Sequence, residues 1–172
     1  MRVDLRPMTR ADLPLLAGWL REPLVAEWWH EDPEAVEQRY GPSLGGDDPT
    51  VLRIAEEAGR PVGFVQWFRF ADEPEYRAEL QPALPVPDHA VSTDYLIGAS
   101  ADRGRGVGAA MLTAALAEIG PVPVVVPVHA GNAASIAVLQ RVGFHVVARA
   151  ELEPDNPAHT RDHVVLLRHP TA

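Results

Sequence analysis

Apolar residues recur along the chain at two spacings, which predict strands and helices. Alternating or continuous apolar runs rich in β-branched residues predict seven strands, at about 3–5, 51–56, 62–70, 90–97, 122–128, 144–150 and 164–168. Apolar residues three and four positions apart, with capping residues or glycines near the ends, predict helices at about 9–20, 32–40, 107–119 and 133–142. This order indicates an α/β fold in which helices flank a mixed central sheet.

Proline and glycine mark the predicted connections. Residues 58–61 read Ala-Gly-Arg-Pro and join two strands as an antiparallel hairpin, and Gly41 and Pro42 are expected to end the helix at 32–40. The segment 71–89 holds several prolines and carboxylates and has no predicted element. A loop of this length in a compact domain is usually functional or mobile.

The composition is that of one globular domain spanning residues 1–172. The chain is 47% hydrophobic and 23% charged, and 15 Lys and Arg against 24 Asp and Glu give a net charge of −9. Such a charge repels nucleic-acid backbones and attracts cationic molecules. We therefore expect no nucleic-acid partner.

The absence of cysteine limits the chemistry and suggests a compartment. Because the sequence contains no cysteine, it can form no disulfide, no thiolate zinc site and no cysteine nucleophile, and a reducing environment is indicated. The first residues lack the apolar stretch of a signal peptide, and the apolar run 122–128 is too short to cross a membrane. We expect a cytoplasmic monomer or homodimer with no membrane partner.

The glycine-rich turn Arg103-Gly104-Arg105-Gly106-Val107-Gly108 is the most informative segment. It follows a predicted strand and opens a predicted helix, so free backbone N–H groups and the positive end of the helix dipole meet at one place. The two arginines add charge, and the glycines allow a close approach to the backbone. The turn therefore predicts a phosphate site. Its spacing differs from the dinucleotide and P-loop motifs, which argues against a dehydrogenase or an NTPase.

This turn resembles the Arg/Gln-x-x-Gly-x-Gly/Ala signature of the GCN5-related N-acetyltransferases, and the segment from Asn132 to Phe144 resembles that family's later motif. The resemblance covers essentially the whole chain. It implies a mixed, mostly antiparallel sheet of about seven strands flanked by helices, acetyl-CoA as cosubstrate and no metal. The residues implied to hold acetyl-CoA are Leu96, Ile97, Gly98, Arg103, Gly104, Arg105, Gly106, Val107, Gly108, Ala109, Asn132 and Ser135.

Within that family, the N-terminal half is similar to aminoglycoside 6'-N-acetyltransferases. The likeness lies in the segments 25–29 and 93–98 and in the acidic, proline-containing stretch between them. It implies a small polycationic aminoglycoside as partner, with Asp94 as catalytic acid or base. The residues implied to bind this substrate are Glu27, Trp28, Trp29, Asp72, Glu73, Glu75, Glu79, Asp94 and Asp155. A core position for the tryptophans and a solvated turn for Asp155 are the alternative interpretations.

The chemistry of acetyl transfer supports the role of Asp94. Because the attacking amine must be neutral, the enzyme has to hold a cation and then accept its proton. A carboxylate does both, and burial strengthens it as a base by raising its pKa above the ordinary value of about 3.9. Backbone N–H groups near Ile97 and Gly98 are expected to stabilise the oxygen of the tetrahedral intermediate. A salt-bridged strand residue is the alternative interpretation of Asp94.

Two positions depart from the family pattern and leave other functions open. Leu139 stands where many relatives carry a tyrosine that can protonate the departing thiolate, and Pro127-Val128 replaces an Asp-Pro pair. The acceptor could instead be a siderophore lysine Nε-amine or a protein N-terminus. A non-catalytic acyl-CoA-binding module is a third hypothesis, against which Asp94 argues. His159 and His163 have the spacing of a metal pair but lie between a proline-rich loop and a strand, so no metal is expected.

Overall fold

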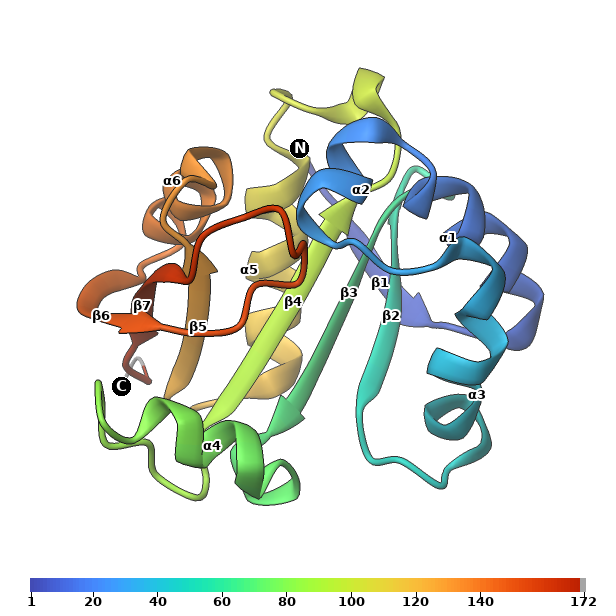
Figure 1. The fold of residues 1–172 in the computed structure, drawn as a ribbon. Coiled ribbons are helices and arrows are strands. Elements are labelled where there is room, and N and C mark those ends of the chain that lie inside the picture. The colour runs from blue at the N-terminus through green and yellow to red at the C-terminus, as the bar shows by residue number, and fades with distance from the viewer. Residues whose placement is uncertain (171–172) are drawn as a thin grey trace.

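A sheet with strand order β1-β2-β3-β4-β5-β7-β6 forms the centre of the computed structural model, which describes residues 1–170 (Figure 1). The strands are β1 (Asp4–Pro7), β2 (Val51–Glu57), β3 (Arg60–Arg69), β4 (Val91–Ile97), β5 (Val124–His129), β6 (His145–Glu151) and β7 (Asp162–Arg168). All neighbouring strands are antiparallel except β4 and β5. The seven-stranded, mostly antiparallel sheet predicted from the sequence is confirmed.

Helices cover both faces of the sheet (Figure 1). One face packs against α1 (Leu13–Leu20), α2 (Pro23–Trp28), α3 (Val36–Gly45) and α4 (Pro74–Leu80), and the other against α5 (Val107–Ile119) and α6 (Ala133–Arg141). Short 3-10 turns lie at Arg10–Asp12, Pro33–Ala35, Phe70–Asp72 and Ser100–Asp102. Alternate residues of β3 serve the two faces: Phe64 packs with α1–α3, and Val65 packs with α5.

The prediction that Gly41 and Pro42 end the third helix is wrong. Both residues lie inside α3, which ends at Gly46 with φ of 87°. The ring of proline fixes a φ that suits a helix, and its carbonyl still accepts a bond, here from Asp47 N at 2.9 Å. Fully buried Tyr40 anchors this helix in the core.

The segment 71–89 also has more regular structure than predicted, because Pro74 starts α4 instead of interrupting a helix. The Tyr76 ring stacks on Phe70 with centroids 5.7 Å apart, and Leu80 is fully buried. Arg77 Nε donates to Val86 O at 2.7 Å and holds the rest of the segment against this helix. The segment that was expected to be a loop therefore contains a helix and packs against the core.

Strands β4 and β5 diverge and leave a gap in the sheet. The two strands pair in parallel at Val91 and Val124, and Val91 N donates to Pro123 O at 3.0 Å. No further ladder pair joins them within residues 1–170. Backbone groups on this side of β4 are therefore free toward the strand's carboxyl end.

No helix among residues 1–170 has the length and apolar character needed to span a bilayer.

Gly98 gives a prediction about packing. A Cβ atom there would lie 2.2 Å from ring atoms of Trp19 in α1, so we expect Gly98→Ala to lower the free energy of unfolding by about 1–3 kcal/mol. Gly18→Ala is the matched control, because a Cβ at that position of α1 meets nothing within 4 Å and alanine favours the helix by up to about 1 kcal/mol. Urea unfolding measures both variants. A Gly98→Ala protein as stable as the wild type would contradict the packing argument.

Candidate active site

One cavity of about 670 Å³ extends from the gap beside β4 to the other side of the sheet. Asp94 and Leu96 of β4 and Gln66 of β3 line it, together with parts of α2, α4, α6 and the connection between β6 and β7. That connection passes close to α2 (Figure 1), where Asn156 Nδ2 donates to Glu27 O at 3.1 Å. The cavity thus joins segments from both halves of the chain.

Many residues singled out in the sequence line this cavity. They are Trp28, Trp29, Glu79, Asp94, Leu96, Ile97, Arg103, Gly104, Asn132, Ser135 and Asp155. The sequence analysis did not name other lining residues with polar groups: Glu31, Arg39, Gln66, Tyr76, Tyr95, Glu153, His129 and Asn156. The first set contains residues from each of the two predicted ligand sites, so one cavity connects parts of both.

The glycine turn has the backbone form that its sequence suggested. Gly104 and Gly106 have φ of 71° and 91°, values that side-chain-bearing residues rarely adopt, and Gly106 caps α5. A Cβ at Gly108 would lie 3.3 Å from Val138, so this glycine allows α5 and α6 to approach. Arg103 lines the cavity, and its guanidinium has no ion pair or side-chain hydrogen bond within residues 1–170.

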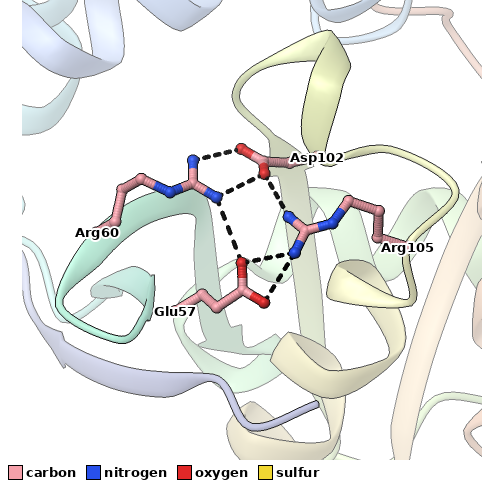
Figure 2. Close-up of polar contacts among 4 residues, drawn as sticks. All are labelled: Glu57, Arg60, Asp102 and Arg105. Atoms are coloured by element: carbon pink, nitrogen blue, oxygen red, sulfur yellow. Dashed lines mark hydrogen bonds and ion pairs between the residues drawn. The ribbon is translucent and has the colours of Figure 1, made fainter.

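Arg105 does not line the cavity, because it belongs to an ion-pair network with Glu57, Arg60 and Asp102 (Figure 2). Buried Asp102 accepts from Arg60 Nη1 and Nη2 at 2.9 and 2.7 Å and from Arg105 Nη1 at 2.7 Å. The pKa of Asp102 is lowered, and the hydrogen bonds from Arg60 make the largest contribution to this shift. Arg105 Nη2 also donates to both oxygens of Glu57 at 3.0 Å. The network ties the glycine turn to the β2–β3 hairpin, and its charges cancel.

The backbone donor at the end of β4 belongs to Ile97. Gly98 N donates to Val62 O at 2.9 Å, which commits that N–H to β3. Hydrogen-bonding direction alternates along an antiparallel pair, so the N–H of Ile97 points away from β3, toward the gap beside β5. Ile97, and not Gly98, therefore presents a free donor, and Gly98 is small because Trp19 occupies the adjacent space.

Asp94 has the properties of a base near neutral pH. The pKa of its carboxyl is raised to about 6, mainly by burial and to a smaller extent by the nearby carboxylate of Asp155. Two groups act in the opposite direction: Gln66 Nε2, which donates to Asp94 Oδ2 at 3.1 Å, and the charge of Arg39. The side chain is thus ionised at physiological pH and still able to hold a proton.

Further carboxylates line the cavity around Asp94: Glu31, Glu79, Glu153 and Asp155. Burial, and then the charge of Glu31, raise the pKa of Asp155. Glu31 accepts a hydrogen bond from the Tyr40 hydroxyl and lies 3.4 Å from Arg39 Nε. This part of the cavity has an excess of negative charge and suits a cation with several charges.

Four other acids proposed from the sequence lie outside the cavity lining. Asp72 pairs with Arg69 at 2.9 Å, and Glu73 and Glu75 are exposed at the start of α4. Glu27 Oε1 accepts from His159 Nε2 at 2.8 Å, a contact that joins α2 to the β6–β7 connection. These acids have structural partners or face solvent.

The two tryptophans occupy different positions. The Trp28 ring lies 4.7 Å from the His159 ring and 5.6 Å from the His129 ring, and all three residues line the cavity. Trp29 packs on the core beside Phe64 and donates from Nε1 to the Tyr40 hydroxyl at 3.2 Å. Trp28 is therefore the aromatic wall, and Trp29 is shared with the core.

A pair of hydroxyl groups lies on the α6 side of the cavity. Tyr95 Oη is 3.1 Å from Ser135 Oγ, and burial raises the pKa of Tyr95 to about 12. Leu139 is fully buried beside Phe144 and is part of the core. Asn132 Oδ1 accepts from Ser135 N at 3.2 Å and caps α6. No group of three or more potential metal-ligating side chains is present in the described part of the chain.

Known proteins with similar sequences and structures share this architecture. Aminoglycoside N(6')-acetyltransferase type 1 of Klebsiella pneumoniae is 25% identical over 167 residues, which cover 91% of this chain and 80% of that protein. The solved structure of aminoglycoside acetyltransferase AAC(6')-Ib in complex with coenzyme A matches with a TM-score of 0.81 at 22% identity, over 97% of this chain and 94% of that one. Ribosomal-protein-alanine N-acetyltransferase from Brucella melitensis matches with a TM-score of 0.69 at 23% identity, over 96% and 98% of the two chains. Residues 8–152 match the acetyltransferase (GNAT) domain family, and the chain therefore belongs to the GNAT acetyltransferases.

Proposed function

We propose that this acetyltransferase moves the acetyl group of acetyl-CoA to a primary amine of a polycationic aminosugar, the 6'-amino group of an aminoglycoside. One observation carries the proposal: a single cavity joins the glycine turn to a carboxylate-rich region, with Asp94 lining it. The relatives named as aminoglycoside acetyltransferases support this choice of acceptor. A cytoplasmic location and a monomeric or dimeric state stay predictions.

The residues of the gap fit acetyl-CoA. The backbone of the glycine turn and the positive end of the α5 dipole suit the pyrophosphate, and Arg103 supplies an unpaired positive charge. The extended pantetheine arm can lie along β4, whose backbone groups on this side lack strand partners beyond Val91. Bound there, the cosubstrate supplies an activated acyl group, and the N–H of Ile97 is suited to bind the thioester oxygen.

The other end of the cavity fits the acceptor. Glu31, Asp155 and their carboxylate neighbours attract the ammonium groups, and the Trp28 ring offers an apolar wall to a sugar. Asp94 takes a proton from the reacting ammonium and frees the nitrogen lone pair to attack the acyl carbon. The chemistry needs no covalent intermediate with the protein.

A second acceptor class has its own support. Arg39 puts a positive charge among the carboxylates of the cavity, which suits an acceptor that carries an acidic group beside its amine. Separately, the likeness to a ribosomal-protein-alanine N-acetyltransferase suggests a protein N-terminus as the acceptor.

The two arginines of the turn are expected to differ. Arg103→Ala removes the free charge at the cavity and should raise the KM for acetyl-CoA by about 10- to 100-fold, since a hydrogen bond to a charged group contributes about 1.5–3 kcal/mol. Arg105→Ala leaves buried Asp102 with one fewer partner and should lower the melting temperature. Steady-state kinetics with thermal unfolding separates the two effects. A raised KM for Arg105→Ala together with a lowered melting temperature for Arg103→Ala would contradict the assignment of Arg103 as the free arginine.

The ionisation of Asp94 predicts a pH profile. We expect kcat/KM to rise with pH through about 6, because only the ionised carboxylate accepts the proton. Asp94→Asn should lower kcat at least about 100-fold, the usual range for a lost general base. It should also raise the melting temperature at pH 7.5 but not at pH 4, because the folded carboxyl binds its proton more tightly than the unfolded one. A flat pH profile between 5 and 8 would argue against this base.

The direct test of the acceptor is thiol release from acetyl-CoA in the presence of different amines. We expect rapid turnover with kanamycin, tobramycin and other aminoglycosides that carry a 6'-amine. Spermidine, lysine derivatives and an alanine-terminated peptide are the controls, together with an aminoglycoside that has a 6'-hydroxyl. Turnover confined to the peptide or to lysine derivatives would overturn the proposed acceptor and leave the acetyltransferase activity in place.

A further inference from the structure

Three histidines lie together in the wall of the cavity, where β5 ends and β7 begins. His129 and His163 are directly opposite each other in the ladder of these strands, and their ring centroids are 5.4 Å apart. The His159 ring, from the connection between β6 and β7, lies 5.0 Å from that of His129 and 4.7 Å from that of Trp28. All four residues line the cavity. This histidine wall therefore combines flat aromatic faces with imidazole nitrogens.

The histidine wall lies on the same face of the sheet as Asp94. Val91 of β4 and Val124 of β5 are partners in the parallel ladder, and both contact the face that α5 covers. Asp94 follows Val91 by three residues and His129 follows Val124 by five, so both side chains are on the opposite face. The difference of two residues corresponds to about 7 Å along the strands, so the wall begins about one sugar ring beyond the base.

His163 presents one free ring nitrogen to the cavity. Its Nδ1 lies 2.8 Å from the carbonyl oxygen of Arg161, which can only accept, so Nδ1 carries a hydrogen and Nε2 is the acceptor of the neutral ring. Nε2 has no hydrogen bond within residues 1–170, and the only buried, unpaired side-chain atom in that range is Gln66 Oε1. Nε2 is therefore accessible. His163 is only 8% exposed and lines the cavity, so a ligand there can reach this nitrogen.

His159 presents a second free nitrogen, and His129 presents none. His159 Nε2 donates to Glu27 Oε1 at 2.8 Å, and its Nδ1 is likewise unpaired and accessible within residues 1–170. His129 Nδ1 accepts from Gly131 N at 3.0 Å, so its Nε2 carries the hydrogen and donates to Thr160 Oγ1 at 3.1 Å. The wall thus offers two uncharged acceptors from neutral rings.

Uncharged acceptors suit uncharged donors. The ammonium groups of a cationic ligand have stronger partners in the carboxylates of the same cavity, because a hydrogen bond between charged groups is about twice as strong as one between neutral groups. Hydroxyl groups are the neutral donors of a sugar, and the C–H face of its ring can pack on Trp28. Residues 1–170 contain no group of three potential metal ligands, so the two nitrogens do not indicate a metal site.

We propose that His159 and His163 determine specificity by accepting hydrogen bonds from the hydroxyl groups of the sugar ring that carries the reacting amine, those at positions 3' and 4'. The inference rests on the proposed transfer to an aminoglycoside. Asp94 holds the ammonium at one side of the ring, and the histidine wall holds the hydroxyl groups at the other. No bond is made or broken at the wall. An amine without ring hydroxyls therefore loses these contacts and is held less firmly beside Asp94.

The test compares two acceptors that share the 6'-amine, kanamycin B and 3',4'-dideoxykanamycin B, which lacks both hydroxyl groups. His163→Phe keeps an aromatic ring and removes Nε2, while the carbonyl of Arg161 keeps its hydrogen bond from Leu152 N at 3.0 Å. We expect kcat/KM for kanamycin B to fall about fivefold, the usual contribution of one neutral hydrogen bond. The value for the dideoxy compound should change by less than about twofold, and the KM for acetyl-CoA should stay the same.

Two further variants complete the experiment. His159→Phe removes the other acceptor nitrogen from a different segment and should give the same selective loss. His145→Phe, at an exposed position of β6 outside the cavity lining, is the matched control and should behave as wild type with both acceptors. Thermal unfolding checks that each variant is folded.

The outcomes separate recognition of hydroxyl groups from support of the wall. Equal losses on both acceptors, or no loss on either, would overturn the subsite and leave the proposed acceptor in place. A wild-type enzyme that acetylates both compounds equally well would overturn it without any variant. If the wild type acetylates neither compound, the proposed acceptor fails and the subsite fails with it.

Discussion

The divergence of β4 from β5 is the constraint on which the rest of the molecule depends. β4 pairs with β3 over its whole length and β5 pairs with β7 over its whole length, while the two strands meet at Val91 and Val124. Helix α5 packs against both halves of the sheet on one face, and a cluster that contains Phe70 and Val125 joins them on the other. Backbone groups left without strand partners must bind water or a ligand. The gap lies where the ladder stops, and packing on the two faces connects the halves beyond that point.

Charge is distributed so that an acidic chain can serve both an anion and a cation. The net charge of −9 would oppose a pyrophosphate, yet near the glycine turn Asp102 and Glu57 are neutralised by Arg60 and Arg105. That leaves backbone N–H groups and Arg103 as the local electrostatic features at the turn. The cavity's carboxylates without an ion pair within residues 1–170 lie across the sheet: Asp94, Glu79 and Asp155. Because the charges of this network cancel, the end of the cavity at the glycine turn can be positive while the end around Asp94 is negative.

The sequence predicted most elements because their signals are local. Strand patterns, the glycine turn and the cap at Asn132 depend on neighbouring residues, and the structure has them at the expected places. Proline was the misleading signal: Pro42 was expected to end a helix that in fact continues past it, and the prolines of 71–89 indicated a loop although the fixed φ of Pro74 suits the first turn of α4. The partners of Arg105 and Asp94 depend on strand register between distant segments, which no local pattern encodes. Gln66 could have been found only from that register.

The two ends of the cavity are formed by different kinds of structure: paired central strands at one end and a connecting segment at the other. Asp94, Gln66 and the Ile97 N–H lie on central strands that are paired along their length, which suits groups whose geometry must hold through a reaction. The opposite wall depends on a connection between β6 and β7, joined to α2 through Glu27 by contacts from Asn156 and His159. A change of sequence in that connection alters what the wall contacts without moving the strands. The proposed acetyl-transfer groups and the proposed acceptor wall therefore lie on separate parts of the fold, and structures named for an aminoglycoside acetyltransferase and for a ribosomal-protein acetyltransferase share that fold.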